Sequence, residues 1–145
     1  MGLKAKYTVN DISRYLQKVT DKVEKRIFNT LVYVGEWFVS EARSMTKSEG
    51  GFGDVTGNLR SSVGYFILKN GHIVHENTAK IHGGTEGIAA AKNVLRDIKK
   101  IKGFQLIGVA GMNYAVYVEA KGYNVISLQA DMALVELKTI LSRAA

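Results

Sequence analysis

The chain has 145 residues, a net charge of +7 and no cysteine, with 46% hydrophobic and 23% charged residues. These values are typical of one globular domain spanning 1–145, and they exclude a disordered chain, a disulfide framework, a thiol nucleophile and a cysteine-ligated zinc site. No apolar run approaches the roughly 18 residues of a membrane helix and no signal-peptide pattern opens the chain, so we expect a soluble protein made in a cytoplasm.

The strongest periodic signal lies near the N-terminus and predicts a long helix. Its apolar face repeats in steps of three and four through Ile12, Leu16, Val19, Val23, Ile27, Leu31, Val34, Phe38, Ala42 and Met45. We expect Asn10 or Asp11 to cap the start, and the glycines of 48–53 to end the helix near Met45. Such a helix is about 50 Å long, so we expect it to break near Thr20 or to project toward a partner.

The two halves of this predicted helix differ in their polar surface. Up to Arg26 one face is charged, whereas from Phe28 to Val39 nearly every side is apolar, which predicts burial on every side. Either this half runs beneath a sheet and is covered by another helix of the same chain, or Tyr33 and Trp37, one turn apart, face another subunit. Aromatic residues suit both environments.

A hairpin and a helix are expected next. Residues rich in β-formers flank Asn70-Gly71, which predicts strands at about 62–69 and 72–78 joined by a tight turn, since both turn residues tolerate positive φ. A helix is expected from about Thr85 to Ile101, ended by Gly103. Its inward residues are predicted to be Ile88, Ala91, Leu95 and Ile98.

The outward residues of this helix are basic. They are Lys92, Arg96 and Lys99, with Lys100 and Lys102 close behind. Positive patches steer anionic partners, but basic helix faces are also commonly just solvated. The stretch Lys92–Lys102 is therefore either a solvated face or a nucleic-acid surface.

The last third of the chain predicts one strand and one helix. Phe104 to Val109 is an apolar run consistent with a buried strand, and 114–119 is either a strand or a helical turn. Ser127 is expected to cap a last helix over Leu128–Arg143. The inward stripe of that helix is predicted to be Ala130, Leu134, Leu137 and Leu141. Together these elements predict an α+β fold, in which long N-terminal and C-terminal helices pack on a small, mostly antiparallel sheet with one further helix inserted.

Neither a metal site nor a phosphate site is expected. His72 and His75 lie three apart in a predicted strand and should point to opposite faces, and His82 lies in a glycine-rich loop. The segment 83–87 precedes a helix but lacks the Gly-Lys-Ser/Thr ending of a P-loop, so it reads as a flexible loop with Thr85 as a cap.

The sequence also gives no sign of catalysis or of a cofactor. There is no Gly-x-Ser-x-Gly elbow. The spacing of the acidic residues does not require a catalytic pair among Asp54, Glu76, Glu86 and Glu119. We therefore expect that the protein is not an enzyme; a small hydrolase or toxin-like enzyme is the weakest alternative.

Two segments are distinctive. They are Asp54-Val55-Thr56-Gly57-Asn58-Leu59-Arg60-Ser61-Ser62-Val63 and Gly108-Val109-Ala110-Gly111-Met112-Asn113-Tyr114-Ala115-Val116-Tyr117-Val118-Glu119. In this order behind a long helix, they resemble the tail-completion or neck proteins (minor tail, head–tail joining) of long-tailed bacteriophages and prophages, over nearly the whole chain. Members have a Thr-Gly-Asn-Leu-Arg-type turn before a strand, then a strand followed by Tyr-Ala-x-Tyr-Val-Glu, and a closing helix.

The chain departs from that family pattern in three places. Ala120-Lys121-Gly122-Tyr123 follows the glutamate where the family often has a hydrophobic residue and Gly-Thr, and Val125-Ile126-Ser127 stands where a Pro-Phe pair is common. The segment Thr85–Lys102 is an elaboration, similar to versions in prophages of Bacteroides-type bacteria. These departures leave the position of the protein within the neck or tail open.

The resemblance implies a structural role in the virion. The protein would join or finish a tail where it meets the head, as a ring of identical subunits such as a hexamer, in contact with other neck or tail proteins and close to DNA. The resemblance brings no catalytic residues and no cofactor. The main alternative is a basic nucleic-acid-binding protein that uses the Lys92–Lys102 helix.

The motif residues have simple physical roles to fill. Gly57 allows a tight turn and Leu59 is expected in the core, while Asn58 or Arg60 can satisfy backbone carbonyls or a neighbour's carboxylate. The second motif is expected to form a packing corner with one hydrogen-bonded carboxylate, from Tyr114, Tyr117 and Glu119. For Arg60 and Glu119, a role within the chain and a role at an interface both remain open.

Overall fold

The computed structural model describes residues 2, 4, 6–53, 56–78, 84–113 and 115–144, without the side chains of Tyr117 and Ala144. The elements in chain order are α1 (Val9–Ser44), a 3-10 turn (Lys47–Glu49), α2 (Asn58–Ser62), β1 (Val63–Lys69), β2 (His72–Asn77), α3 (Thr85–Val94), β3 (Phe104–Ala110), α4 (Ala115–Ala120) and α5 (Ser127–Ala144). The predicted α+β class, with long first and last helices and one inserted helix, is confirmed.

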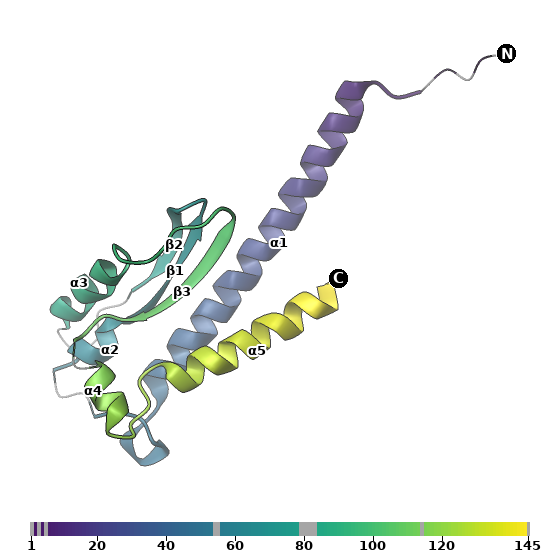
Figure 1. The fold of residues 1–145 in the computed structure, drawn as a ribbon. Helices are drawn as coiled ribbons and strands as arrows, with labels where there is room; N and C mark the ends of the chain where they lie inside the picture. The colour runs from purple at the N-terminus through teal and green to yellow at the C-terminus, as the bar shows by residue number, and fades with distance from the viewer. Residues whose placement is uncertain are drawn as a thin grey trace.

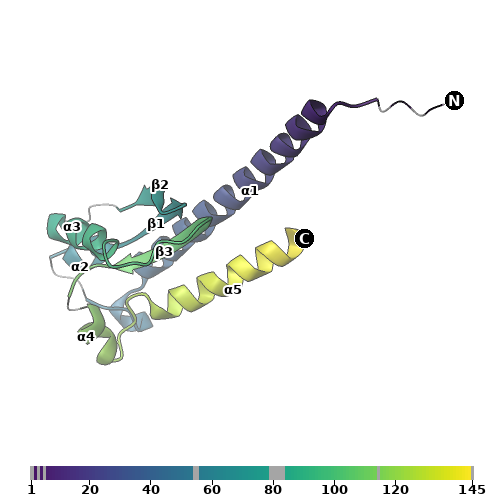
Figure 2. The same cartoon turned by 45° about the horizontal axis from the view of Figure 1, so that its top comes forward.

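The described strands form one antiparallel sheet in the order β2-β1-β3. Helices α1 and α5 lie on one face of the sheet and α3 lies on the other (Figures 1 and 2). The central strand β1 is buried from Val63 to Leu68, because alternate side chains enter two different cores. Val63, Tyr65 and Ile67 join the core under α1, while Phe66 and Leu68 join the core under α3.

Helix α1 is continuous through Thr20, so the alternative of a break there is wrong. Its 36 residues are about 54 Å long, and its N-terminal half extends beyond the sheet and beyond α5 (Figure 1). The expected cap at Asn10 or Asp11 is wrong. Thr8 is the N-cap, and Asp11 completes a capping box by accepting a hydrogen bond from the Thr8 amide at 2.9 Å.

The apolar face of α1 is buried only in its second half. Leu31, Val34, Phe38 and Ala42 are in the core, whereas the side chains in the N-terminal half are 41–80% exposed at Val9, Ile12, Leu16, Val19 and Val23. The predicted apolar stripe is therefore one continuous helical face that the rest of the chain covers only in part.

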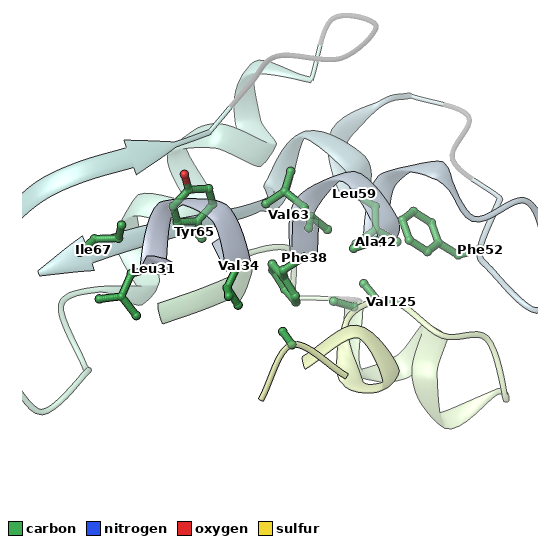
Figure 3. Packing of buried hydrophobic residues seen from close by; sticks show 13 residues of the cluster. Leu31, Val34, Phe38, Ala42, Phe52, Leu59, Val63, Tyr65, Ile67 and Val125 are labelled. Atoms are coloured by element: carbon green, nitrogen blue, oxygen red, sulfur yellow. The ribbon is translucent and has the colours of Figure 1, made fainter. Parts of the chain in front are cut away.

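The larger core lies between the second half of α1, the sheet and the chain around Val125 (Figure 3). Gly35 of α1 lies directly against the Tyr65 ring of β1, and Phe38 lies close to Gly108 of β3. Leu59 and Phe52 lie together at the end nearest α2. Burial of large apolar side chains from four separate segments supplies the main driving force for holding α1 on the sheet.

The predicted hairpin is confirmed. Strands 63–69 and 72–77 pair antiparallel around Asn70 and Gly71, whose φ angles of 52° and 82° are those of a tight hairpin turn. The pairing contains a bulge at Ile67/Leu68. The bulge interrupts strict alternation along β2.

Helix α3 is shorter than predicted, and Gly103 does not end it. The helix stops at Val94, and the next amides, from Leu95 to Asp97, donate to carbonyls three residues back, as in a tightened last turn. Leu95 and Ile98 still pack on the core as predicted. Gly103, at φ 90°, instead exchanges two hydrogen bonds with Asn70 at the hairpin turn, each 2.9 Å long.

The remaining elements differ from prediction in burial rather than in position. Strand β3 is an edge strand, so only Ile107 and Val109 are buried. The ambiguous segment forms helix α4. Helix α5 packs through Gln129 and Ala133, with Leu137 and Ile140 partly buried. Of the four residues predicted to face inward on α5, Leu137 is the one that is partly buried. Ala130, Leu134 and Leu141 are exposed, because α5 lies against α1 through a neighbouring face.

Candidate functional site

The first motif forms a tight turn into α2. Gly57 is buried with φ 74°, a left-handed conformation that favours glycine, and its carbonyl accepts the Ser61 amide. Leu59 is fully buried in the core, as expected. The amide of Asn58 lies 3.4 Å from the Thr56 hydroxyl, so the turn is also bonded internally.

Arg60 bonds the end of α1 to the loop that follows. Its guanidinium donates to the carbonyl of Arg43, to that of Met45 at 3.0 Å and to that of Phe52 at 3.3 Å. The carbonyls in the last turn of a helix have no partner within the helix. The guanidinium also lies 5.0 Å from the centre of the Phe52 ring. Arg60 therefore makes the contacts of a C-terminal helix cap within its own chain.

Gly84 and Gly87, at the start of α3, allow close packing. A Cβ atom on Gly84 would overlap the Ser61 side chain, and one on Gly87 would overlap the backbone of Asn58. The start of α3 therefore lies directly on α2, at a separation that only glycine allows. The expected Thr85 cap is wrong, because Gly84 occupies the N-cap position and Thr85 is the first helical residue.

Glu119 bonds α4 to the start of α5. Its Oε1 accepts the amides of Val125, Ile126 and Ser127 at 3.2, 2.9 and 3.0 Å, and its Oε2 accepts the Ser127 hydroxyl at 2.7 Å. Partial burial acts to raise the pKa of Glu119, but the hydrogen bonds outweigh it and hold the pKa below its usual value. The predicted Ser127 cap is wrong, because Ser127 is the first residue of α5 and its hydroxyl donates to Glu119. Glu119 accepts the Ser127 amide, and the Asn124 side chain accepts the Leu128 amide at 3.0 Å.

The other two members of the second motif cannot be placed. Tyr114 lies outside the described residues, as does the side chain of Tyr117. The backbone of Tyr117 belongs to α4. The predicted packing corner is thus described only at Glu119.

Tyr33 and Trp37 differ in exposure. Tyr33 is 55% exposed and lies in a groove with Val19, Val23 and Ile140. Trp37 is partly buried against the main core. The all-round apolar half of α1 is therefore covered by its own chain at Trp37, but Tyr33 remains accessible to another molecule.

Sequence reasoning missed a polar network between α1 and the sheet. The Tyr65 hydroxyl donates to Glu36 at 2.7 Å and lies 3.0 Å from His75 Nε2, and Asn77 donates to the other Glu36 oxygen at 2.8 Å. Burial, together with the nearby Glu36 carboxylate, raises the pKa of Tyr65. Because Tyr65 is fully buried, its hydroxyl is not open to a substrate.

The histidines form no metal site within the described part of the chain. The bulge pairs His75 with Ile67 and His72 with Lys69, two alternate residues of β1, so the argument that these histidines face opposite ways fails. Even so, no group of three or more histidine, aspartate or glutamate side chains gathers among the described residues. His82 lies outside them.

The basic stretch does not form a single helix. Lys92 lies in the last turn of α3 and pairs with Glu76 of β2 at 2.9 Å. Beyond the helix, the exposed cations follow a turn and a loop at Arg96, Lys99, Lys100 and Lys102. Gln105 orders this loop by donating to the Lys99 carbonyl and accepting the Ile101 amide, each at 3.0 Å.

An open apolar cavity lies between the second half of α1, the sheet and α5. Its volume is about 210 Å³, and its walls include Val34, Phe38, Leu106, Ala130, Leu134 and Leu137. We call this space the α5 groove. Three of the four residues that the predicted α5 stripe placed in the core, Ala130, Leu134 and Leu137, line this groove.

Comparisons with known proteins found no match to a family model, to a curated protein or to a solved structure. Within the described residues, no helix combines the length and the apolar character needed to cross a bilayer.

Proposed function

We propose that this chain is a structural protein of a bacteriophage or prophage neck or tail, which acts by assembling into a ring of identical subunits that also contacts neighbouring virion proteins. In this role it completes the tail or joins it to the head. It is made in the host cytoplasm and ends in the virion. It needs no catalytic residue and no cofactor.

The observation that carries the proposal is the N-terminal half of α1. It extends into solvent with five exposed apolar side chains on one face, and exposed apolar surface of this kind marks a contact with another molecule. The elements also follow the order that the resemblance implies, from a long helix through the turn at Gly57 to a closing helix. Both motif charges, Arg60 and Glu119, are used to join helices, as suits a rigid building block.

Electron microscopy of the purified chain, with light scattering at low and high salt, tests the proposal. We expect rings of uniform diameter and a discrete multimer that high salt does not dissociate, because apolar contacts are not screened. If the chain forms no ring alone, the same images are taken after co-expression with the proteins of neighbouring genes. Failure to form rings in either sample would contradict the proposal.

A nucleic-acid-binding function is the second candidate, because Arg96, Lys99, Lys100 and Lys102 are exposed together on one ordered segment and the net charge is +7. Binding of this kind weakens steeply with salt, because phosphate contacts release counterions. A salt-sensitive complex with duplex DNA, lost in Lys99→Gln/Lys100→Gln but kept in Arg14→Gln/Lys18→Gln, would favour this function over the ring.

A further inference from the structure

The projecting half of α1, residues 9–26, carries a stripe spaced for contact with another helix. Val9, Ile12, Leu16, Val19 and Val23 follow each other at alternating steps of three and four. This is the spacing of residues that pack into the surface of a second helix. We call these five residues the α1 stripe.

Most charges of this half lie away from the stripe. Ser13, Tyr15 and Thr20, which flank it, are uncharged, but Lys22 and Arg26 flank its C-terminal end beside Val19 and Val23. The other charged residues, among them Arg14, Lys18, Asp21 and Lys25, lie farther round the helix, where they stay in water when the stripe is covered. Covering the stripe with a helix therefore buries few charged groups.

The chain cannot cover the stripe itself. Helix α1 is unbroken from Val9 to Ser44, so Val9, Ile12 and Leu16 are held beyond the part of α1 that meets α5. Val19 and Val23 share a groove with Ile140 of α5 but stay 41% and 52% exposed. Val23 and Val34 are separated by about 16 Å along the helix axis. A fold back onto the body would require a break in the helix, and no glycine or proline lies between residues 9 and 26.

The same chain has a second uncovered apolar surface, the α5 groove. Its wall on α5 continues through exposed Leu134 to exposed Leu141. Ala130 and Gly108 in its lining are exposed and have a small side chain or none, so they leave space above the backbone. The groove has room for side chains inserted from a helix that lies along α5.

The two surfaces match in length and in chemistry. The α1 stripe is about 21 Å long from Val9 to Val23, and the α5 side of the groove is about 16 Å long from Ala130 to Leu141. Charged residues are absent from the named lining of the groove. Two copies that each carry a charge of +7 repel one another, so an apolar contact is the kind that can hold them together.

We propose that the α1 stripe of one copy docks in the α5 groove of a second copy. The stripe and the groove are different surfaces of the same chain, so the contact is heterologous: each copy gives one helix and receives another. Heterologous contacts close into rings when the rotation between copies allows it. The inference deepens the proposed function by naming its interface, and it rests on that function only for the expectation that the assembly is closed.

Three double variants at exposed positions test the contact. Leu16→Gln/Val19→Gln alters the stripe, Ala130→Gln/Leu134→Gln alters the groove, and Arg14→Gln/Lys18→Gln changes the opposite face of α1 as the control. Analytical ultracentrifugation measures self-association, and circular dichroism confirms that each variant is folded. We expect the stripe and groove variants each to associate about 100-fold more weakly, and the control to associate as the wild type does.

Mixing the two defective variants gives the sharpest readout. The stripe variant keeps an intact groove and the groove variant keeps an intact stripe, so together they form one contact and no more. We expect each to be monomeric alone and the mixture to give a one-to-one heterodimer that does not grow. A mixture that stays monomeric would overturn the inference.

The remaining outcomes separate the interface from the ring. Rings that form equally well from the stripe variant overturn this interface but leave the proposed function standing. A wild-type chain that is monomeric at every concentration overturns the interface, and the co-expression images then decide the proposed function. If the stripe variant instead loses only binding to vesicles of anionic lipid, the stripe is a membrane surface and the inference is wrong.

Discussion

Arg60 and Glu119 perform the same task at opposite ends of two helices. Arg60 donates to carbonyls at the C-terminal end of α1 and just beyond it, and Glu119 accepts amides at the N-terminal end of α5. Each places a full charge where a helix end carries a partial charge of the opposite sign. The segment that follows α1 and the segment that precedes α5 are also joined, because the Asn124 amide donates to the Gly50 carbonyl at 2.9 Å.

Replacing Arg60 should destabilise the fold. Arg60→Met keeps the apolar stem but leaves three carbonyls without their donor, so we expect a loss of about 2–4 kcal/mol in the free energy of unfolding. Arg60→Lys should recover only part of it, since an ammonium lacks the planar fork. Urea unfolding measures the free energy of unfolding of both variants, and the exposed Arg96→Met serves as the control. A loss below about 0.5 kcal/mol, the usual range for surface changes, would show that the cap contributes little.

Replacing Glu119 should destabilise the fold in a pH-dependent way. Because its folded pKa lies below the ordinary value of 4.5, the charge contributes its full stability above about that pH, and the contribution is lost as the pH falls through the folded pKa. We expect Glu119→Gln to cost about 1–2 kcal/mol at neutral pH, and less as the solution is acidified. Urea unfolding across pH measures the difference, with exposed Glu41→Gln as control. A cost that does not shrink in acid would contradict the role of the charge.

At the scale of elements, the sequence predicted correctly those features that residues close together in the chain determine. The turn at Asn70-Gly71 fixed the hairpin, and the repeat of apolar residues predicted nearly the full length of α1. The periodicity that predicted a helix to Ile101 correctly placed Leu95 and Ile98 inward, but it could not reveal that the chain leaves the helix at Val94 in order to return along the sheet. On α5 the leucines predicted the wrong buried face, because the packing partner is α1 and the groove leaves Leu134 uncovered.

The two halves of α1 should differ in how readily they open. Packing protects residues 31–42, whereas the helix over 12–23 is held only by its own hydrogen bonds and by its connection to the packed half. In dilute, monomeric protein we expect the amides of 12–23 to open at a cost of about 1–2 kcal/mol and those of 31–42 only with global unfolding. Hydrogen exchange with mass spectrometry measures both segments, and equal protection in the monomer would contradict the prediction.

At the scale of the whole molecule, contacts between distant segments decided what the sequence could not show. The Tyr65 hydroxyl meets Glu36, 29 residues away, and Asn77 meets the same carboxylate from 41 residues away, so no spacing rule connects them. The glycines at 84 and 87 suggest a mobile loop by composition, but they are required by the close approach of α3 to α2. Arg60 and Glu119 were identified as candidates from their motifs, yet their partners became clear only from the fold.

Helix α1 is a rod clamped at one end. The sheet, α5 and Arg60 hold its second half, and Glu24 pairs with Lys69 of β1 at 2.6 Å, so the helix from Val9 to Glu24 projects about 22 Å from the body. A tilt of about ten degrees at the clamp therefore moves the tip at Val9 by about 4 Å, following from that length. A small change in how the body binds its neighbours therefore moves the far end of the helix by a much larger distance.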